Sequence, residues 1–336
     1  MESSFGRSRL LIYALPFILI TTMSTAVEAQ SVFGMGFPGA SYLDGFWRGA
    51  VLGCGAPGFG PGPTVYVGGS ADYANGTSYG LATQGVAIAG LVSLQNSYSN
   101  HGTWLGLSLP IDLGPRFGVS ASAWTLLRNG TLNSSDVQGG VGAGHSTRQW
   151  NVDPWWSFVD GLAIFRCGYG CNIIGGIRYD HDTVAFNNPV VTSGAVASAI
   201  TDQADVNTEN WIPLIGTQYE NNCYLGSLIF RAVGFPAVGG NVRWSEDFAA
   251  PTFVFKGSGN YRRGYFMELF MEYSKKLGLG QVGLFGRWNV FHAESTLTVN
   301  RVFGGAAIAT ENYDFSLNRS SWTLGGSMSL AFNMPY

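Results

Sequence analysis

The sequence is poor in charged residues. Only 12% of its 336 residues are Asp, Glu, Lys or Arg, whereas soluble domains average about 25%. Eighteen basic and 21 acidic residues give a formal net charge of −3, so the chain lacks the basic surface that nucleic-acid binding requires. This balance argues against a nucleic-acid partner and against an ordinary soluble domain. Aromatic residues make up 14% of the chain, which argues against disorder as well.

Long hydrophobic runs are also lacking. No apolar run of about 18 residues follows residue 29, so the sequence predicts no membrane-spanning helix. At the amino terminus, Arg7 and Arg9 precede an apolar run of 11 residues, and a small-residue pattern ends at Ala29. These features predict a signal peptide for Sec export, residues 1–29, cleaved near Ala29. An uncleaved anchor is the alternative, but 11 residues fall well short of the roughly 20 that a membrane helix needs.

Apolar and polar residues alternate along the last segment of the chain, residues 322–336. Such alternation places successive side chains on opposite faces of a strand. The polar face carries no charge, which is typical of a strand between lipid and an enclosed interior rather than of a water-facing strand in a soluble β-sandwich. A secreted β-sandwich is the competing architecture. The apolar face consists of Trp322, Leu324, Gly326, Met328, Leu330, Phe332, Met334 and Tyr336.

This segment resembles the carboxy-terminal assembly signal of Gram-negative outer-membrane β-barrel proteins, a final aromatic residue preceded by apolar residues at alternating positions. The resemblance implies an all-β fold, a transmembrane antiparallel up-and-down β-barrel. It also implies a location in the cell outer membrane, contact with outer-membrane lipid, and recognition of the last strand by the outer-membrane assembly machinery. We expect 10–14 strands, with the barrel in residues 81–336. The Gly/Pro-rich segment 30–80 adds at most one or two of these strands.

Ten segments have the pattern of strands, and the connections between them alternate in length. Short turns are predicted at 112–115, 168–170, 233–239 and 275–280, all on the periplasmic side if the carboxy terminus is periplasmic. Longer outer loops are expected at 128–156, 181–221 and 294–320. The predicted strands are 84–95, 102–111, 116–127, 157–167, 171–180, 222–232, 240–248, 263–274, 281–293 and 321–336.

One predicted hairpin places opposite charges inside the barrel. If Tyr273 pairs with Val282, the antiparallel register sets Glu268 opposite Arg287 on the interior face. An ion pair between them would neutralise both charges away from water.

Strand parity assigns ten charged residues to the interior. They could line a pore and set its ion preference, or they could pair and fill a narrow barrel. Ten strands favour the filled interior and fourteen favour the pore. Six arginines against four acidic residues would give a pore a weak preference for anions. The candidate lumen-lining residues are Arg116, Asp160, Arg166, Arg178, Asp180, Arg231, Arg243, Glu268, Glu272 and Arg287.

Likeness to pore-forming outer-membrane proteins implies a passive pore for small solutes or ions, without enzymatic activity, cofactor or metal. A closed barrel with a structural or adhesive role through its long outer loops is the alternative. A barrel lipid hydrolase is a third class, for which His292, Ser295 and Asn289 are the residues to consider, but their spacing alone does not make them converge.

The chain has 4 cysteines. Cys167 and Cys171 bracket a predicted turn and are a candidate disulfide in an oxidising compartment. Two cysteines are too few for a structural zinc site, which needs four ligands. The pairing of Cys54 and Cys223 is left open.

Overall fold

The computed structural model describes residues 63–70, 76–84, 91–98, 102–113, 116–127, 132–140, 143–168, 170–193, 201–223, 226–248, 253–277, 280–303 and 306–330. These residues form one antiparallel sheet of 14 strands. Within this part of the chain, no helix is long and apolar enough to cross a membrane. The strands are β1 (Thr64–Ser70), β2 (Gly76–Thr83), β3 (Leu91–Tyr98), β4 (Gly102–Asp112), β5 (Phe117–Leu127), β6 (Leu132–Gly140), β7 (Ala143–Gly168), β8 (Cys171–Ser193), β9 (Thr201–Cys223), β10 (Gly226–Phe235), β11 (Gly239–Phe248), β12 (Phe253–Leu277), β13 (Gly280–Phe303) and β14 (Ala306–Leu330).

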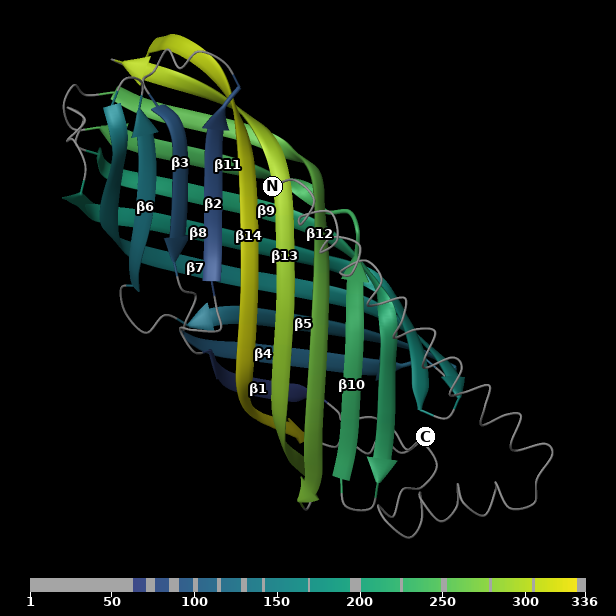
Figure 1. The fold of residues 1–336 in the computed structure, drawn as a ribbon. Helices are drawn as coiled ribbons and strands as arrows, with labels where there is room; N and C mark the ends of the chain where they lie inside the picture. The colour runs from purple at the N-terminus through teal and green to yellow at the C-terminus, as the bar shows by residue number, and fades with distance from the viewer. Residues whose placement is uncertain are drawn as a thin grey trace, which may run out of the picture.

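The sheet closes on itself, because β1 pairs with β14 as well as with β4. Six strands of 23 to 26 residues, β7, β8, β9, β12, β13 and β14, run the whole length of the barrel. The shorter strands complete two levels of the wall (Figure 1). We call the level that contains β1, β4, β5 and β10 the lower section, and the level that contains β2, β3, β6 and β11 the upper section.

The shorter strands join end to end in pairs. Along β14, for example, β1 pairs with residues 324–329 and β2 continues with residues 313–320. In the same way β3 leads into β4, β5 into β6, and β10 into β11. Each pair acts as one long strand, so both sections are rings of ten strands. The predicted barrel with 10–14 strands is confirmed: the sheet has 14 strands, and ten of them surround the interior at each level.

The lower section is apolar outside. Aromatic residues border this apolar belt, with Tyr265 and Tyr273 at its two edges on β12. The eight residue steps from Tyr265 to Tyr273 span about 26 Å of strand, close to the roughly 25 Å apolar band of outer-membrane barrels. Exposed belt residues include Val65, Val67, Leu105, Leu107, Leu109, Ile111, Phe117, Val159, Phe165, Ile173, Ile177, Ile215, Met271, Tyr273, Val282, Leu284, Leu324 and Met328, with Trp155, Trp211 and Trp322 at the upper edge.

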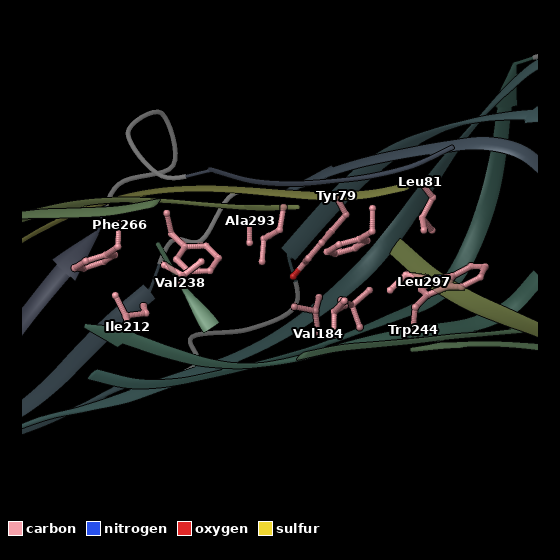
Figure 2. Close-up of a cluster of buried hydrophobic side chains, with 14 of the residues drawn as sticks. Tyr79, Leu81, Val184, Ile212, Val238, Trp244, Phe266, Ala293 and Leu297 are labelled. Carbon is pink, nitrogen blue, oxygen red and sulfur yellow. The ribbon is translucent and has the colours of Figure 1, made fainter. Parts of the chain in front are cut away.

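The upper section has the opposite arrangement, polar outside and apolar inside. On β13, Val282, Leu284 and Trp288 face outward below, whereas Leu297 and Val299 face inward above. Figure 2 shows the buried apolar cluster to which this core belongs, with side chains pointing toward one another from facing walls and with Ile212 and Phe266 reaching into the lower section. The labelled residues are Tyr79, Leu81, Val184, Ile212, Val238, Trp244, Phe266, Ala293 and Leu297. Each long strand therefore reverses the polarity of its two faces at the upper edge of the apolar belt.

Several boundaries differ from the sequence predictions. The expected outer loops 128–156, 181–221 and 294–320 are largely strand, because the long strands continue above the belt. The expected turn at 233–239 is wrong, since β10 and β11 continue along β12 and β9 with only a short break. The actual connection at this end follows β9, between Cys223 and Gly226. Two strands, β1 and β2, lie largely in the Gly/Pro-rich segment 30–80, for which one or two strands were expected. The predicted signal peptide and the terminal residues 331–336 lie outside the described residues.

Candidate functional site

The interior of the lower section contains a buried ionic group centred on Glu268. On one side, Glu268 Oε2 lies 2.8 Å from Arg287 Nε and 2.9 Å from Arg178 Nη1. On the other, Glu268 Oε1 lies 3.1 Å from Arg231 Nη2. Arg178 also donates from Nη2 to Asp160 Oδ2 at 2.8 Å. We call Asp160, Arg178, Arg231, Glu268 and Arg287 the Glu268 cluster.

The pairing of β12 with β13 explains why Glu268 and Arg287 meet. Glu268 on β12 and Arg287 on β13 are neighbours in adjacent strands, and the structure confirms their predicted ion pair. The predicted register is wrong by two residues, because Tyr273 pairs with Leu284 rather than with Val282. Glu268 therefore faces Asn289 directly and reaches Arg287 diagonally, a distance that the long guanidinium side chain spans.

A second ionic group lies at the boundary between the two sections. Arg319 Nη2 donates to Asp180 Oδ2 at 2.7 Å, and Arg319 Nη1 lies 3.4 Å from Asp182 Oδ2. Trp156 and Asn210 also donate to Asp180, each at 2.7 Å. We call Asp180, Asp182 and Arg319 the Arg319 cluster. Because Asp180 and Asp182 are two residues apart on β8, both carboxylates point inward toward the same arginine.

Aromatic rings enclose these arginines. The guanidinium carbon of Arg178 lies 4.2 Å from the ring centre of Phe158, and that of Arg287 lies 4.0 Å from the same ring. Arg319 lies 3.8 Å from the ring centre of Trp156. Such cation–π contacts stabilise a desolvated guanidinium by about 2 kcal/mol. Phe158 therefore contacts both Arg178 and Arg287, the two arginines that also share Glu268 Oε2.

Large side chains occupy the interior beside the ionic clusters. Trp104, Trp156 and Phe158 have only 1–2% of their surface exposed, and Arg178 has 1%. Below the Glu268 cluster, Tyr66 donates to Glu272 at 3.0 Å and packs on Trp124 with ring centres 4.9 Å apart. A ring of about eight strands encloses little more than its own side chains. In this ten-stranded ring, the Glu268 cluster and the aromatic side chains around it are buried inside the lower section.

Most, but not all, of the ten predicted interior residues point into the barrel. Seven of the ten point into the barrel: Asp160, Arg178, Asp180, Arg231, Glu268, Glu272 and Arg287. Arg116 and Arg166 lie at its lower end, where Arg116 is exposed and Arg166 half-buried. Arg243 is exposed on the outer face, so its prediction is wrong. The reason is that β11 belongs to the upper section, where Val242 and Trp244 point inward instead.

Sequence reasoning missed Arg319, Asp182 and Glu246, which are buried in the interior. Residues 182 and 319 fell in predicted loops, so no strand parity was assigned to them. With the missed residues included, the buried charged side chains together with Arg231 are four arginines and six carboxylates. Carboxylates outnumber arginines in this set, so the expected excess of positive charge, from which the anion preference was argued, is wrong.

The residues considered for lipid hydrolysis do not converge. His292 lies on the outer face, where its Nδ1 is 2.7 Å from Asn318 Oδ1 and its Nε2 is 3.2 Å from Glu294 Oε1. Ser295 and Asn289 are buried on the inner face of the same strand. Among the described residues, no group of three or more His, Cys, Asp or Glu side chains could hold a metal ion.

Cys167 and Cys171 lie at the lower end of the hairpin formed by β7 and β8, and both are free thiols. The thiol of Cys167 donates to the carbonyl oxygen of Cys171 at 3.0 Å. Cys54 and the side chain of Cys223 lie outside the described part of the structure.

No family model and no curated protein matches the sequence. Among solved structures, the barrel is similar to the outer membrane protease OmpT from Escherichia coli, with a TM-score of 0.55 and 11% identity over 82% of this chain and 99% of that chain. OprG from Pseudomonas aeruginosa matches with a TM-score of 0.30, 10% identity, and coverage of 81% and 98%. The translocator domain of NalP from Neisseria meningitidis matches with a TM-score of 0.29, 11% identity, and coverage of 86% and 95%. The chain thus has the fold of bacterial outer-membrane β-barrels.

Proposed function

We propose that this chain, with its outer-membrane β-barrel fold, is closed to passive diffusion and acts at the cell surface through its upper section. The observation that carries the proposal is the filled interior. The Glu268 cluster and its aromatic neighbours occupy the lower section, and the apolar core occupies the upper section. A solute or ion would have to displace buried ion pairs to pass.

The proposal includes the route to the membrane. Residues 1–29 direct Sec export and are removed near Ala29, and the last strand engages the outer-membrane assembly machinery. The apolar belt then lies in outer-membrane lipid, with the lower end in the periplasm and the upper section outside the cell. From Trp288 at the belt edge to Phe303, β13 extends by about 50 Å of strand, which raises the upper section well above the bilayer.

The outer wall of the upper section supports a structural or adhesive role. On β13 and β14, uncharged polar side chains bond to one another across the strands. Thr310 donates to Asn300 at 2.7 Å, and Thr298 donates to Asn312 at 3.3 Å. This is strand rather than loop, so the surface is rigid and its hydroxyl and amide groups hold fixed positions for contact with a partner.

We propose no enzymatic activity, although OmpT, which shares the fold, is a protease. The buried carboxylates Asp180 and Asp182 are bound to Arg319 beneath the apolar core. The described histidine side chains, His181 and His292, belong to the outer face. A carboxylate–histidine pair for hydrolysis would need both kinds of group on the same side of the wall.

Planar-bilayer recording of the purified, folded protein tests the proposal. We expect no single-channel steps, and a porin reconstituted in the same way serves as the positive control. Folding is checked beforehand by β-sheet circular dichroism and by heat-dependent migration on a gel. A reproducible conductance step from the folded barrel would overturn the closed-barrel proposal in favour of the passive pore.

A further inference from the structure

Two thiols lie together at the lower end of the barrel. Cys167 is exposed at the end of β7, and the half-buried Cys171 begins β8. The sulfur of Cys167 is 3.0 Å from the carbonyl oxygen of Cys171, so it lies beside the residue with which it would pair. Both side chains share the outer face with Phe165 and Ile173.

The turn between them is held in place by β9. Gly170 has a φ of +79°, a conformation that favours glycine. Its carbonyl oxygen accepts the backbone N–H of Glu220 at 2.7 Å. A Cβ on Gly170 would lie only 2.2 Å from the carbonyl oxygen of Glu220, so the close approach also requires glycine. Gly170 is therefore fixed against β9, and it holds the adjoining Cys171 in place near Cys167.

We propose that Cys167 and Cys171 form an intramolecular disulfide in the periplasm, made by exchange with a protein disulfide of a periplasmic oxidant. The proposal rests on the periplasmic location of the lower end given under the proposed function. It does not depend on whether the barrel conducts.

The exchange takes place in two steps. The Cys167 thiolate attacks one sulfur of the oxidant's disulfide, breaks that S–S bond and forms a mixed disulfide. Cys171 then loses its proton and attacks the Cys167 sulfur, which breaks the mixed disulfide and releases the oxidant sulfur that Cys167 had attacked. Two protons and two electrons pass from this chain to the oxidant, which becomes a dithiol, while one S–S bond forms here.

The environments of the two thiols set this order. Cys171 is half-buried, so a protein oxidant reaches its sulfur less readily. Cys167 is the more exposed thiol and meets the oxidant first. Cys171 is held beside it and resolves the mixed disulfide.

The native chain offers a direct test by mass spectrometry. Trypsin cleaves after Arg166 and Arg178, so one peptide, residues 167–178, contains both cysteines. Outer membranes are first quenched with acid to stop thiol exchange. The protein is then denatured, alkylated with N-ethylmaleimide and digested without reduction. We expect this peptide unlabelled and lighter than the dithiol form by two hydrogen atoms, and doubly labelled if reduction precedes alkylation. A doubly labelled peptide without reduction, or one linked to a peptide of Cys54 or Cys223, would overturn the proposal.

Three controls separate the possible failures. The chain without residues 1–29, kept in the reducing cytosol, is expected to give the doubly labelled peptide. The variant Cys171→Ser is expected to give a singly labelled peptide from outer membranes. Fractionation shows where the chain resides: a chain missing from the outer membrane contradicts the proposed location, whereas labelled thiols in an outer-membrane chain contradict the disulfide alone.

Discussion

Glu268→Gln tests whether the Glu268 cluster stabilises the barrel as its geometry implies. The substitution keeps the size of the side chain and removes the negative charge that Arg178, Arg231 and Arg287 share. Asp160 is then the only carboxylate of the cluster that remains for these arginines. Removing one partner of a buried ion pair costs about 3–5 kcal/mol, because a charge is left without compensation in the interior. The Glu268 side chain is only 1% exposed, so water does not screen the loss.

Glu294→Gln is the matched control. Glu294 Oε2 lies 3.0 Å from Arg263 Nε, almost the same separation as in the pair of Glu268 with Arg287. The side chains of Glu294 and Arg263 are 25% and 71% exposed, however. Exposed pairs of this kind contribute about 0.2–1 kcal/mol. The two variants thus make the same chemical change at similar distances but at different burial.

The assay is equilibrium unfolding in urea of the barrel folded into lipid vesicles, followed by tryptophan fluorescence. We expect Glu268→Gln to lower the free energy of unfolding by several kcal/mol and Glu294→Gln to lower it by less than about 1 kcal/mol. Equal losses in the two variants would refute the reasoning, because burial would then make no difference to the value of the ion pair.

Two further predictions concern a lysine placed on the outer wall and the ionisation of Asp205. Leu324→Lys and Ser316→Lys place the same charge on the outer face of β14, in the apolar belt and in the upper section respectively. We expect Leu324→Lys to lower the free energy of unfolding by up to about 2–4 kcal/mol and Ser316→Lys to lower it little. The same urea unfolding measures both losses. Similar losses in the two variants would show that the belt does not contact lipid. In the upper section, burial and the nearby Asp247 raise the pKa of Asp205 above its ordinary value. Its contribution to stability is therefore most favourable at low pH and decreases as the pH rises through the ordinary Asp range to the raised pKa. Asp205→Asn is expected to remove that decrease, and a titration of stability from pH 3 to pH 7 with no difference between the variant and the native chain would contradict it.

The sequence predicts the lower section well and the upper section poorly, for one physical reason. On β14, the apolar residues of the belt occupy even positions from Trp322 to Met328, whereas Tyr313, Phe315 and Leu317 above them occupy odd positions. The strand is continuous, but its apolar face changes from outside to inside. A search for unbroken alternation takes that change of phase as the end of a strand, so the upper halves of the long strands were predicted as loops.

The same reversal explains the outcome at the candidate site. Glu268 and Arg287 were found because both lie in the lower section, where polar residues point inward. Arg319 and Asp182 lie at the boundary, where neither face has a consistent pattern, and were missed. Arg243 was assigned to the interior by a parity that holds only below that boundary. Contacts across the barrel, such as that of Arg178 on β8 with Glu268 on β12, depend on the closure of the sheet, which local patterning does not reveal.

The reversal of polarity along each long strand also has a consequence for biogenesis. If the lower end is periplasmic, as proposed, a chain delivered from the periplasm must move the future upper section through the hydrocarbon before its sheet is complete. That section presents Thr298, Asn300, Asn312 and their neighbours on its outside, and these amides and hydroxyls are costly to desolvate. Spontaneous insertion should therefore be slowest in thick, well-ordered bilayers and faster where the membrane is thinned. The length of polar wall to be translocated, rather than the height of the apolar belt, then sets the barrier to assembly.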